Sequence, residues 1–211
     1  MKRYLVPMSI GTALVVAGAV WGLVAAAKEQ AKPADVLIIH GGGTPCENMG
    51  KFTPENVDAV SCPTPPGMNC AKAADLLAEA LRAKQLNVTV VPADAIKHRS
   101  EILAARCVVL ASPSYFGNAS WKMHKLFHEK FWQVHTLGGK CLEGRRFALL
   151  ATGMHENRCK QTLAAMEDVV KSCQGTPGPT AVVIINQPAD ETKAAAAKFA
   201  DEIAGKLTEG K

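Results

Sequence analysis

Two adjacent aromatic residues followed by a glycine are the residues of this chain whose types and spacing best suit ligand chemistry. Tyr115 and Phe116 precede Gly117 within the segment Ser112–Trp121, where a surface loop would ordinarily be polar. A glycine permits positive φ and close approach of the backbone, so this arrangement suits a planar ring-shaped ligand. The alternative is that the two aromatic rings close the end of a hydrophobic core.

The neighbouring sequence predicts that this segment joins a strand to a helix. The apolar run 107–111 before it is of strand type, and apolar residues recur at helical spacing from Trp121 to Trp132 after it. Pro113 fixes one φ angle in the loop, and Ser120 is placed to cap the helix N-terminus. A loop in this position holds its side chains at the end of a strand.

Strand and helix patterns alternate along most of the chain, which predicts an α/β fold with a doubly wound parallel sheet. The expected strands are Val36–His40, Val88–Val91, Cys107–Ala111, Arg146–Ala151 and Ala181–Ile185. The other expected helices are Asn69–Lys84, Asp94–Ala105, Arg158–Ser172 and Pro188–Leu207. Gly175–Pro179 is expected to interrupt regular structure before the fifth strand.

The Ser112–Trp121 segment resembles the S-P-x-Y-F-G-x-x-S segment that wraps the flavin in flavodoxin-like NAD(P)H:FMN reductases and flavodoxins. The resemblance covers residues from about 35 to 208. It implies a flavodoxin-like five-stranded sheet of strand order 2-1-3-4-5 that binds FMN noncovalently. Tyr115 and Phe116 would line the flavin ring, and the amides of Gly117, Asn118 and Gly153 would bond its polar edge.

Three loops are expected to meet at the carboxyl ends of the strands, where ligands of open α/β sheets bind. In the first, Asn69 matches the family pattern that holds the FMN phosphate, whereas Cys70 replaces a threonine. In the third, Met154 replaces a glycine. The cofactor-binding residues that the resemblance implies are Gly41, Gly42, Asn69, Cys70, Pro113, Ser114, Tyr115, Phe116, Gly117, Asn118, Thr152, Gly153 and Met154. No catalytic residue is assigned, because the pair His155–Glu156 reads better as a helix cap with solvated charges.

The N-terminus carries an uncharged stretch that ends at Ala27 and is about 36 Å long as a helix. Residues 1–27 are expected to be a signal peptide or a transmembrane anchor, and a buried helix is the third alternative. Residues 28–35 are a predicted linker, and 36–208 the flavodoxin-like domain. We expect the protein to be membrane-associated and exported to the periplasmic side. A cytoplasm-facing anchor is the alternative.

The seven cysteines give two further expectations and exclude one kind of site. No C-x-x-C spacing occurs, so no metal site is predicted. In an exported protein, Cys46 and Cys62 are expected to form a disulfide, and Cys107 to be buried within a strand. Cys70 and Cys159 lie near helix N-termini, where the dipole is expected to lower a thiol pKa.

The sequence thus predicts an FMN-binding oxidoreductase or electron carrier at a membrane. The electron donor would be NAD(P)H, a quinol or a redox protein, and a homodimer is compatible with the sequence. Two alternatives are a scaffold domain that has lost FMN and a thiol-redox protein. Nucleic acid is excluded as a partner, because the net charge of +5 comes from scattered residues that form no basic stripe.

Overall fold

Five parallel strands form the centre of the molecule in this computed structural model, which describes residues 33–42, 70–132, 141–184 and 188–209. The strand order is β2-β1-β3-β4-β5, and every neighbouring pair is parallel. This order confirms the topology that the resemblance implied. The strands are β1 (Val36–His40), β2 (Val88–Pro92), β3 (Cys107–Pro113), β4 (Arg146–Gly153) and β5 (Thr176–Ile184).

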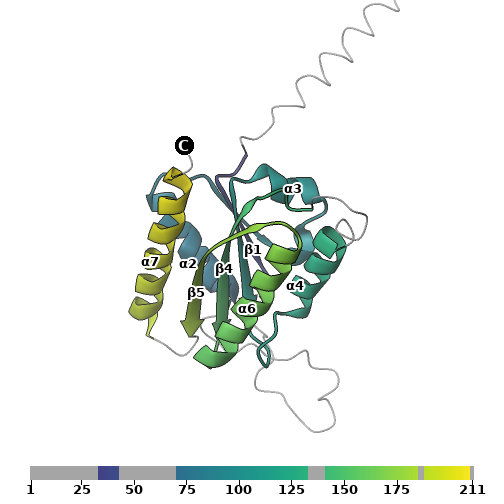
Figure 1. Cartoon of the computed structure of the whole chain (residues 1–211). Helices are drawn as coiled ribbons and strands as arrows, with labels where there is room; N and C mark the ends of the chain where they lie inside the picture. Colours follow the sequence, from purple (N-terminus) through teal and green to yellow (C-terminus); the bar gives the residue numbers. More distant parts are fainter. Residues whose placement is uncertain (1–32, 43–69, 133–140, 185–187, 210–211) are drawn as a thin grey trace, which may run out of the picture. The chain divides into compact units, whose positions relative to one another are not determined.

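Helices cover both faces of the sheet (Figure 1). One face packs against α2 (Cys70–Ala83) and α7 (Ala189–Thr208). The other packs against α3 (Arg99–Ala104), α4 (Trp121–Leu126), the π-helical turn η3 (Phe127–Trp132) and α6 (Glu156–Ser172). A short 3₁₀ turn, η2 (Ala93–Ala95), lies between β2 and α3. The sheet is therefore doubly wound, as the sequence predicted.

The strands read as continuous apolar runs because both of their faces are buried. In β1, Leu37 and Ile39 belong to the core covered by α3, α4 and α6, whereas Val36 and Ile38 belong to the core covered by α2 and α7. This alternation follows from the two-residue period of a strand. Full burial of each such side chain stabilises the fold by about 1.5–3 kcal/mol.

The fifth strand begins earlier than the sequence predicted. The prediction started it at Ala181 and treated Gly175–Pro179 as an interruption, but β5 already runs from Thr176. An edge strand tolerates prolines, since donors that face away from the sheet are not needed for the ladder. The Thr176 amide donates to Arg145 O over 2.8 Å, so the missing donor of Pro177 faces outward.

The predicted helix 94–105 is also wrong in extent, because it divides into η2 and the short α3. The carboxylate of Glu101 accepts hydrogen bonds from the amides of Lys97 and His98, at 3.0 and 2.7 Å. These bonds fix the start of α3 at Arg99 and leave the preceding residues extended. β4 in turn continues to Gly153, two residues beyond its predicted end.

Within the described part of the chain, we find no helix long and apolar enough to cross a bilayer. Residues 1–27, and with them the predicted anchor or signal peptide, lie outside that part. The proposed linker 28–35 and the boundaries of the domain stay predictions.

Candidate functional site

A tight turn follows β3 at the carboxyl edge of the sheet. The Tyr115 amide donates to Asn118 O and the Asn118 amide donates to Tyr115 O, both over 2.9 Å. Between them, Phe116 has φ +52° and Gly117 has φ +88°. Positive φ at both central residues is the signature of a type I′ turn. The segment Tyr115–Asn118, here named the aromatic turn, is therefore a small, hydrogen-bonded unit.

The aromatic turn presents its rings to solvent. Tyr115 is 43% exposed and Phe116 is 89% exposed. The alternative that these rings close the hydrophobic core is therefore wrong for Phe116. A bulky residue in the left-handed region costs about 1–2 kcal/mol, so this backbone conformation is strained. Strain of this kind concentrates at functional sites, where the surrounding structure maintains it.

Helix α6 packs against the aromatic turn. Gly117 is buried, and a Cβ atom at this position would lie 2.4 Å from Gln161 Oε1. Beside it, the Thr162 hydroxyl donates to Ser114 Oγ over 2.8 Å. The Ser114 amide also donates to Thr152 O over 2.8 Å, which ties the start of the turn to β4. Sequence reasoning missed Gln161 and Thr162, because neither is part of a recognisable motif.

Two buried serines fasten the ends of the loop to each other. The Ser112 hydroxyl accepts a hydrogen bond from the Ser120 amide over 2.9 Å and donates to Pro113 O over 3.0 Å. The Ser120 hydroxyl accepts a hydrogen bond from the Met123 amide over 3.4 Å. This last bond confirms Ser120 as the N-cap of α4. The start and the end of the loop are consequently joined by a hydrogen bond between Ser120 and Ser112.

The loop after β4 lies beside the aromatic turn. Thr152 is buried, whereas Met154 is 55% exposed and adds an apolar side chain to this edge. Gly153 is required for close approach to α6, because a Cβ atom there would lie 2.8 Å from Cys159 Sγ. Tyr115, Phe116 and Met154 thus come from neighbouring strand ends and are all exposed.

The pair His155–Glu156 forms no catalytic arrangement among the described residues. His155 is the N-cap residue of α6 and makes no side-chain cap hydrogen bond. The Glu156 carboxylate lies 2.7 Å from Lys160 Nζ in an exposed ion pair. That ammonium group lowers the pKa of Glu156. The pair therefore reads as a helix start with solvated charges.

The loop after β1 is described at its two ends, and its middle, residues 43–69 with Asn69, lies outside the described residues. The Gly41 amide donates to Ala111 O over 2.8 Å, so it is engaged in the sheet. A Cβ atom on Gly41 would lie 2.2 Å from Ser120 Oγ, and one on Gly42 would lie 2.7 Å from Cys70 Cβ. Both glycines therefore allow close contact between β1 and its neighbours.

The Cys70 thiol lies within this contact and is fully buried. Burial raises the pKa of Cys70 to about 12, although hydrogen bonding with the Thr152 hydroxyl and the Gly42 and Gly41 backbone opposes the rise. Burial also raises the pKa of Cys159, and the charge of Glu156 adds to the effect. The expectation of lowered thiol pKa values is therefore wrong, because desolvation outweighs the helix dipole.

His40, at the end of β1, is another polar residue near this edge that the sequence did not predict as part of the site. Burial lowers the pKa of His40. Its Nδ1 atom is buried and has no hydrogen-bond partner among the described residues. A neutral imidazole thus lies at the same edge of the sheet as the aromatic turn.

The described cysteines are all buried and free: Cys70, Cys107, Cys141, Cys159 and Cys173. This confirms the expectation for Cys107, which is 5% exposed in β3. Cys46 and Cys62, the predicted disulfide partners, lie outside the described residues.

Comparison with protein families gives one match that covers more than half of the chain. The model of the family described as flavodoxin matches residues 68–199. A comparison with curated protein sequences found no match.

Solved structures with the same fold are numerous. Flavodoxin from Streptococcus pneumoniae TIGR4 is 18% identical, with a TM-score of 0.53 over 81% of this chain and 97% of that one. Oxidised Flavodoxin 2 from Bacillus cereus is 16% identical, with a TM-score of 0.56 over 82% of this chain and 99% of that one. Rubredoxin oxygen:oxidoreductase from Desulfovibrio gigas is 16% identical, with a TM-score of 0.56, and the match spans 92% of this chain and 41% of that one. At these identities the likeness establishes the fold.

Proposed function

Because the chain belongs to the flavodoxin family, we propose that it binds FMN noncovalently at the carboxyl edge of its sheet and carries electrons. When bound, the flavin supplies one- and two-electron transfer, and the protein positions and tunes its ring. The aromatic turn is the observation that carries this proposal. It holds an exposed Phe116 in a strained conformation next to a second exposed ring.

The exposed side chains around the aromatic turn support a site for the flavin ring. Tyr115, Phe116 and Met154 provide an exposed apolar and aromatic lining from two neighbouring strand ends. The Asn118 amide is bonded to Tyr115 O within the turn, which favours other donors for the polar edge of the ring. We assign the polar edge of the ring to the Gly117 amide and to the backbone at Gly153. Pro113 and Ser114 position the aromatic turn relative to β4, because both residues pair with Thr152.

The phosphate side would use the N-terminus of α2, where backbone amides and the helix dipole favour an anion. The Gly42 amide, Asn69 and Cys70 are the residues that we propose there. Cys70 contributes through its backbone, because its thiol is buried and protonated. The engaged Gly41 amide favours the alternative, a flavodoxin-like scaffold domain without FMN. The third alternative, a thiol-redox protein, is disfavoured by the raised thiol pKa values.

Flavin titration of the purified full chain tests the proposal. FMN fluorescence should be quenched on binding, and riboflavin, which lacks the phosphate, separates the two halves of the site. Binding of FMN well above riboflavin supports both halves. Equal binding of the two flavins would reject the assignment of Gly42, Asn69 and Cys70. If neither FMN nor riboflavin binds, the proposal is rejected in favour of the scaffold domain without FMN.

The proposal extends to a membrane. An uncharged stretch within residues 1–27 supports an anchor or a signal peptide, and with it an oxidoreductase on the periplasmic side. A quinol or a redox protein would then be the donor, whereas a cytoplasm-facing domain would use NAD(P)H. Protease treatment of intact and permeabilised spheroplasts decides: digestion in intact spheroplasts supports export, and digestion only after permeabilisation rejects it.

A further inference from the structure

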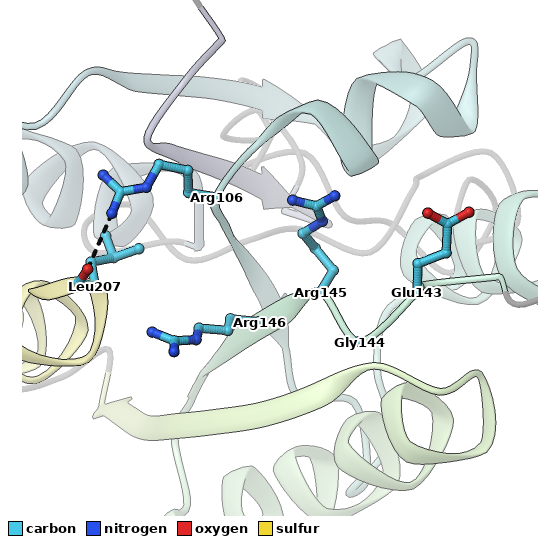
Figure 2. A pocket seen from close by; sticks show the side chains of 6 residues that line it. All are labelled: Arg106, Glu143, Gly144, Arg145, Arg146 and Leu207. Atoms are coloured by element: carbon cyan, nitrogen blue, oxygen red, sulfur yellow. Dashed lines mark hydrogen bonds between the residues drawn. The ribbon is translucent and has the colours of Figure 1, made fainter. Parts of the chain in front are cut away.

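A cavity of about 380 Å³ opens at the amino ends of β3 and β4 (Figure 2). The aromatic turn lies at the opposite, carboxyl end of β3. The lining of the cavity consists of Arg106, Glu143, Gly144, Arg145, Arg146 and Leu207. This volume lies within the usual range of ligand pockets, about 300–1,000 Å³. Three of its six lining residues are arginines, which is an unusual concentration of positive charge for one small cavity.

Main-chain carbonyls hold the three guanidinium groups in place. Arg106 Nη2 donates to Leu207 O over 3.1 Å, and Arg146 Nη1 donates to Lys206 O. These carbonyls belong to the last turn of α7, where orphan acceptors are found. Arg145 Nη1 donates to Ala105 O, just after α3, over 3.3 Å. The arginines are therefore oriented before any ligand arrives.

The positive charges of this cavity are only partly balanced. Asp35 pairs with Arg106, with 3.0 Å between Nη1 and Oδ1. Among the described residues, neither Arg145 nor Arg146 has a carboxylate within ion-pair distance. Glu143 lies at the rim, and its side chain is exposed. Two guanidinium charges are thus left without an ion-pair partner in the described structure.

The hydrogen-bond donors of these arginines are also incompletely used. A guanidinium carries five N–H donors, and the carbonyl contacts use one each on Arg145 and Arg146. Arg145 Nε is buried and has no partner in the part of the chain that the structure describes. A buried donor without an acceptor is costly, by about 1–3 kcal/mol. An oxyanion in the cavity would supply the missing acceptors.

We propose that this cavity binds a phosphate monoester of a small molecule, held by Arg145 and Arg146 and positioned by Arg106. The dianion of a monoester matches the two guanidinium charges that lack an ion-pair partner, and guanidinium groups bind phosphate oxygens in a bidentate manner. Gly144 leaves room for the ester substituent, because beyond its two chain neighbours no atom lies within 4 Å of where its Cβ would be. This site is distinct from the proposed flavin phosphate site, which lies at the other end of the strands.

Calorimetric titration of the full chain with methyl phosphate and dimethyl phosphate tests this proposal. The two probes differ in charge, because the monoester is a dianion above its second pKa of about 6. We expect methyl phosphate to bind about tenfold or more tightly than dimethyl phosphate at pH 7.5 and constant ionic strength. Equal affinity for the diester would reject a monoester site.

Two variants separate this cavity from general charge effects and from any binding at the flavin site. Arg146→Gln should raise the Kd for methyl phosphate about tenfold or more. Arg82→Gln is the matched control, because Arg82 also donates to a carbonyl, that of Val88 over 3.0 Å, but lies outside the cavity. An equal effect of both variants would overturn the proposal.

Chemical protection tests the site without a substitution that could disturb the fold. Phenylglyoxal modifies accessible guanidinium groups, and peptide mapping locates the products. Methyl phosphate should protect Arg146 and Arg145 and leave the labelling of Arg82 unchanged. Protection that is the same at all three arginines, or absent from Arg146, would reject the site.

Discussion

Gln161 lies directly against Gly117: a Cβ atom on this glycine would come within 2.4 Å of Gln161 Oε1. The contact joins the aromatic turn to α6, and a side chain at Gly117 would force the Gln161 side chain to move. Because Gly117 also has φ +88°, two independent constraints act on one residue.

Gly117→Val should therefore distort the aromatic turn while leaving the sheet intact. We expect the affinity for FMN to fall by more than about tenfold, or 1.4 kcal/mol, because a β-branched residue resists positive φ. Fluorescence titration measures this. The matched control is Gln85→Val, at φ +63° but remote from the site, which should destabilise the fold and spare FMN binding. FMN binding by Gly117→Val equal to that of the parent would contradict the role of this turn.

Phe116→Gly should separate stability from binding. Glycine adopts φ +52° without strain, so the free energy of unfolding should stay level or rise by up to about 1 kcal/mol. FMN affinity should nevertheless fall, because the exposed ring is lost. Denaturant unfolding of the apoprotein and flavin titration measure the two effects. Gln85→Gly should show the same gain in stability without the loss of affinity, and a parallel loss in both variants would count against the assignment.

Ser112→Ala should loosen the loop at its base. The substitution leaves the amide of Ser120 without its acceptor, and Ser112 is fully buried. We expect the free energy of unfolding to fall by about 1–3 kcal/mol, with weaker FMN binding as a secondary effect. Thr208→Ala, which removes an exposed hydroxyl bonded to Gly205 O, is the control and should change stability by less. Equal losses in the two variants would show that Ser112 does not hold the loop.

The stability of the protein should decline at alkaline pH through its buried thiols. Burial raises the pKa of Cys107 to about 12, so the folded state keeps a proton that the unfolded state loses near pH 9. The free energy of unfolding should then fall as pH rises from 9 towards 12, by up to about 1.4 kcal/mol per pH unit for each such thiol.

Cys107→Ala should flatten this decline relative to the parent. Val109→Ala, in the same strand and also buried, removes side-chain volume from the core without removing a thiol, so its decline should match that of the parent. Urea unfolding at a series of pH values gives both slopes. If the free energy of unfolding of Cys107→Ala fell with pH as steeply as that of the parent, the Cys107 thiol would have an ordinary pKa in the folded state.

Much of the fold could be predicted from the sequence, because strands that are buried on both faces have uninterrupted apolar sequences. Val36–His40 and Cys107–Ala111 lie within strands as predicted, and Ser120 is the predicted cap. The start of β5 could not be predicted, since its prolines are acceptable only on an edge strand and local sequence does not reveal which strand is at the edge. Edge position is a property of the assembled sheet.

The loop after β3 could be predicted from the sequence, but the pKa values of the neighbouring thiols could not. The aromatic turn lies between β3 and α4, as the strand and helix patterns predicted, whereas burial raises the pKa values of Cys70 and Cys159, opposite to the prediction. Helix position can be read from a sequence, whereas the depth of burial depends on contacts between distant segments. The arginine cavity escaped prediction for the same reason, because Arg106 and Arg146 are 40 positions apart in the chain.

Pro177, which offers no amide to the outer edge of β5, also limits how this molecule can associate. A sixth strand from another chain would need a continuous row of donors and acceptors there, and that row is broken at Pro177. At the opposite edge, β2 ends in Pro92 after only five residues. Both borders of the sheet thus discourage strand addition, so a homodimer of this chain should form through helical surfaces and not by extension of the sheet.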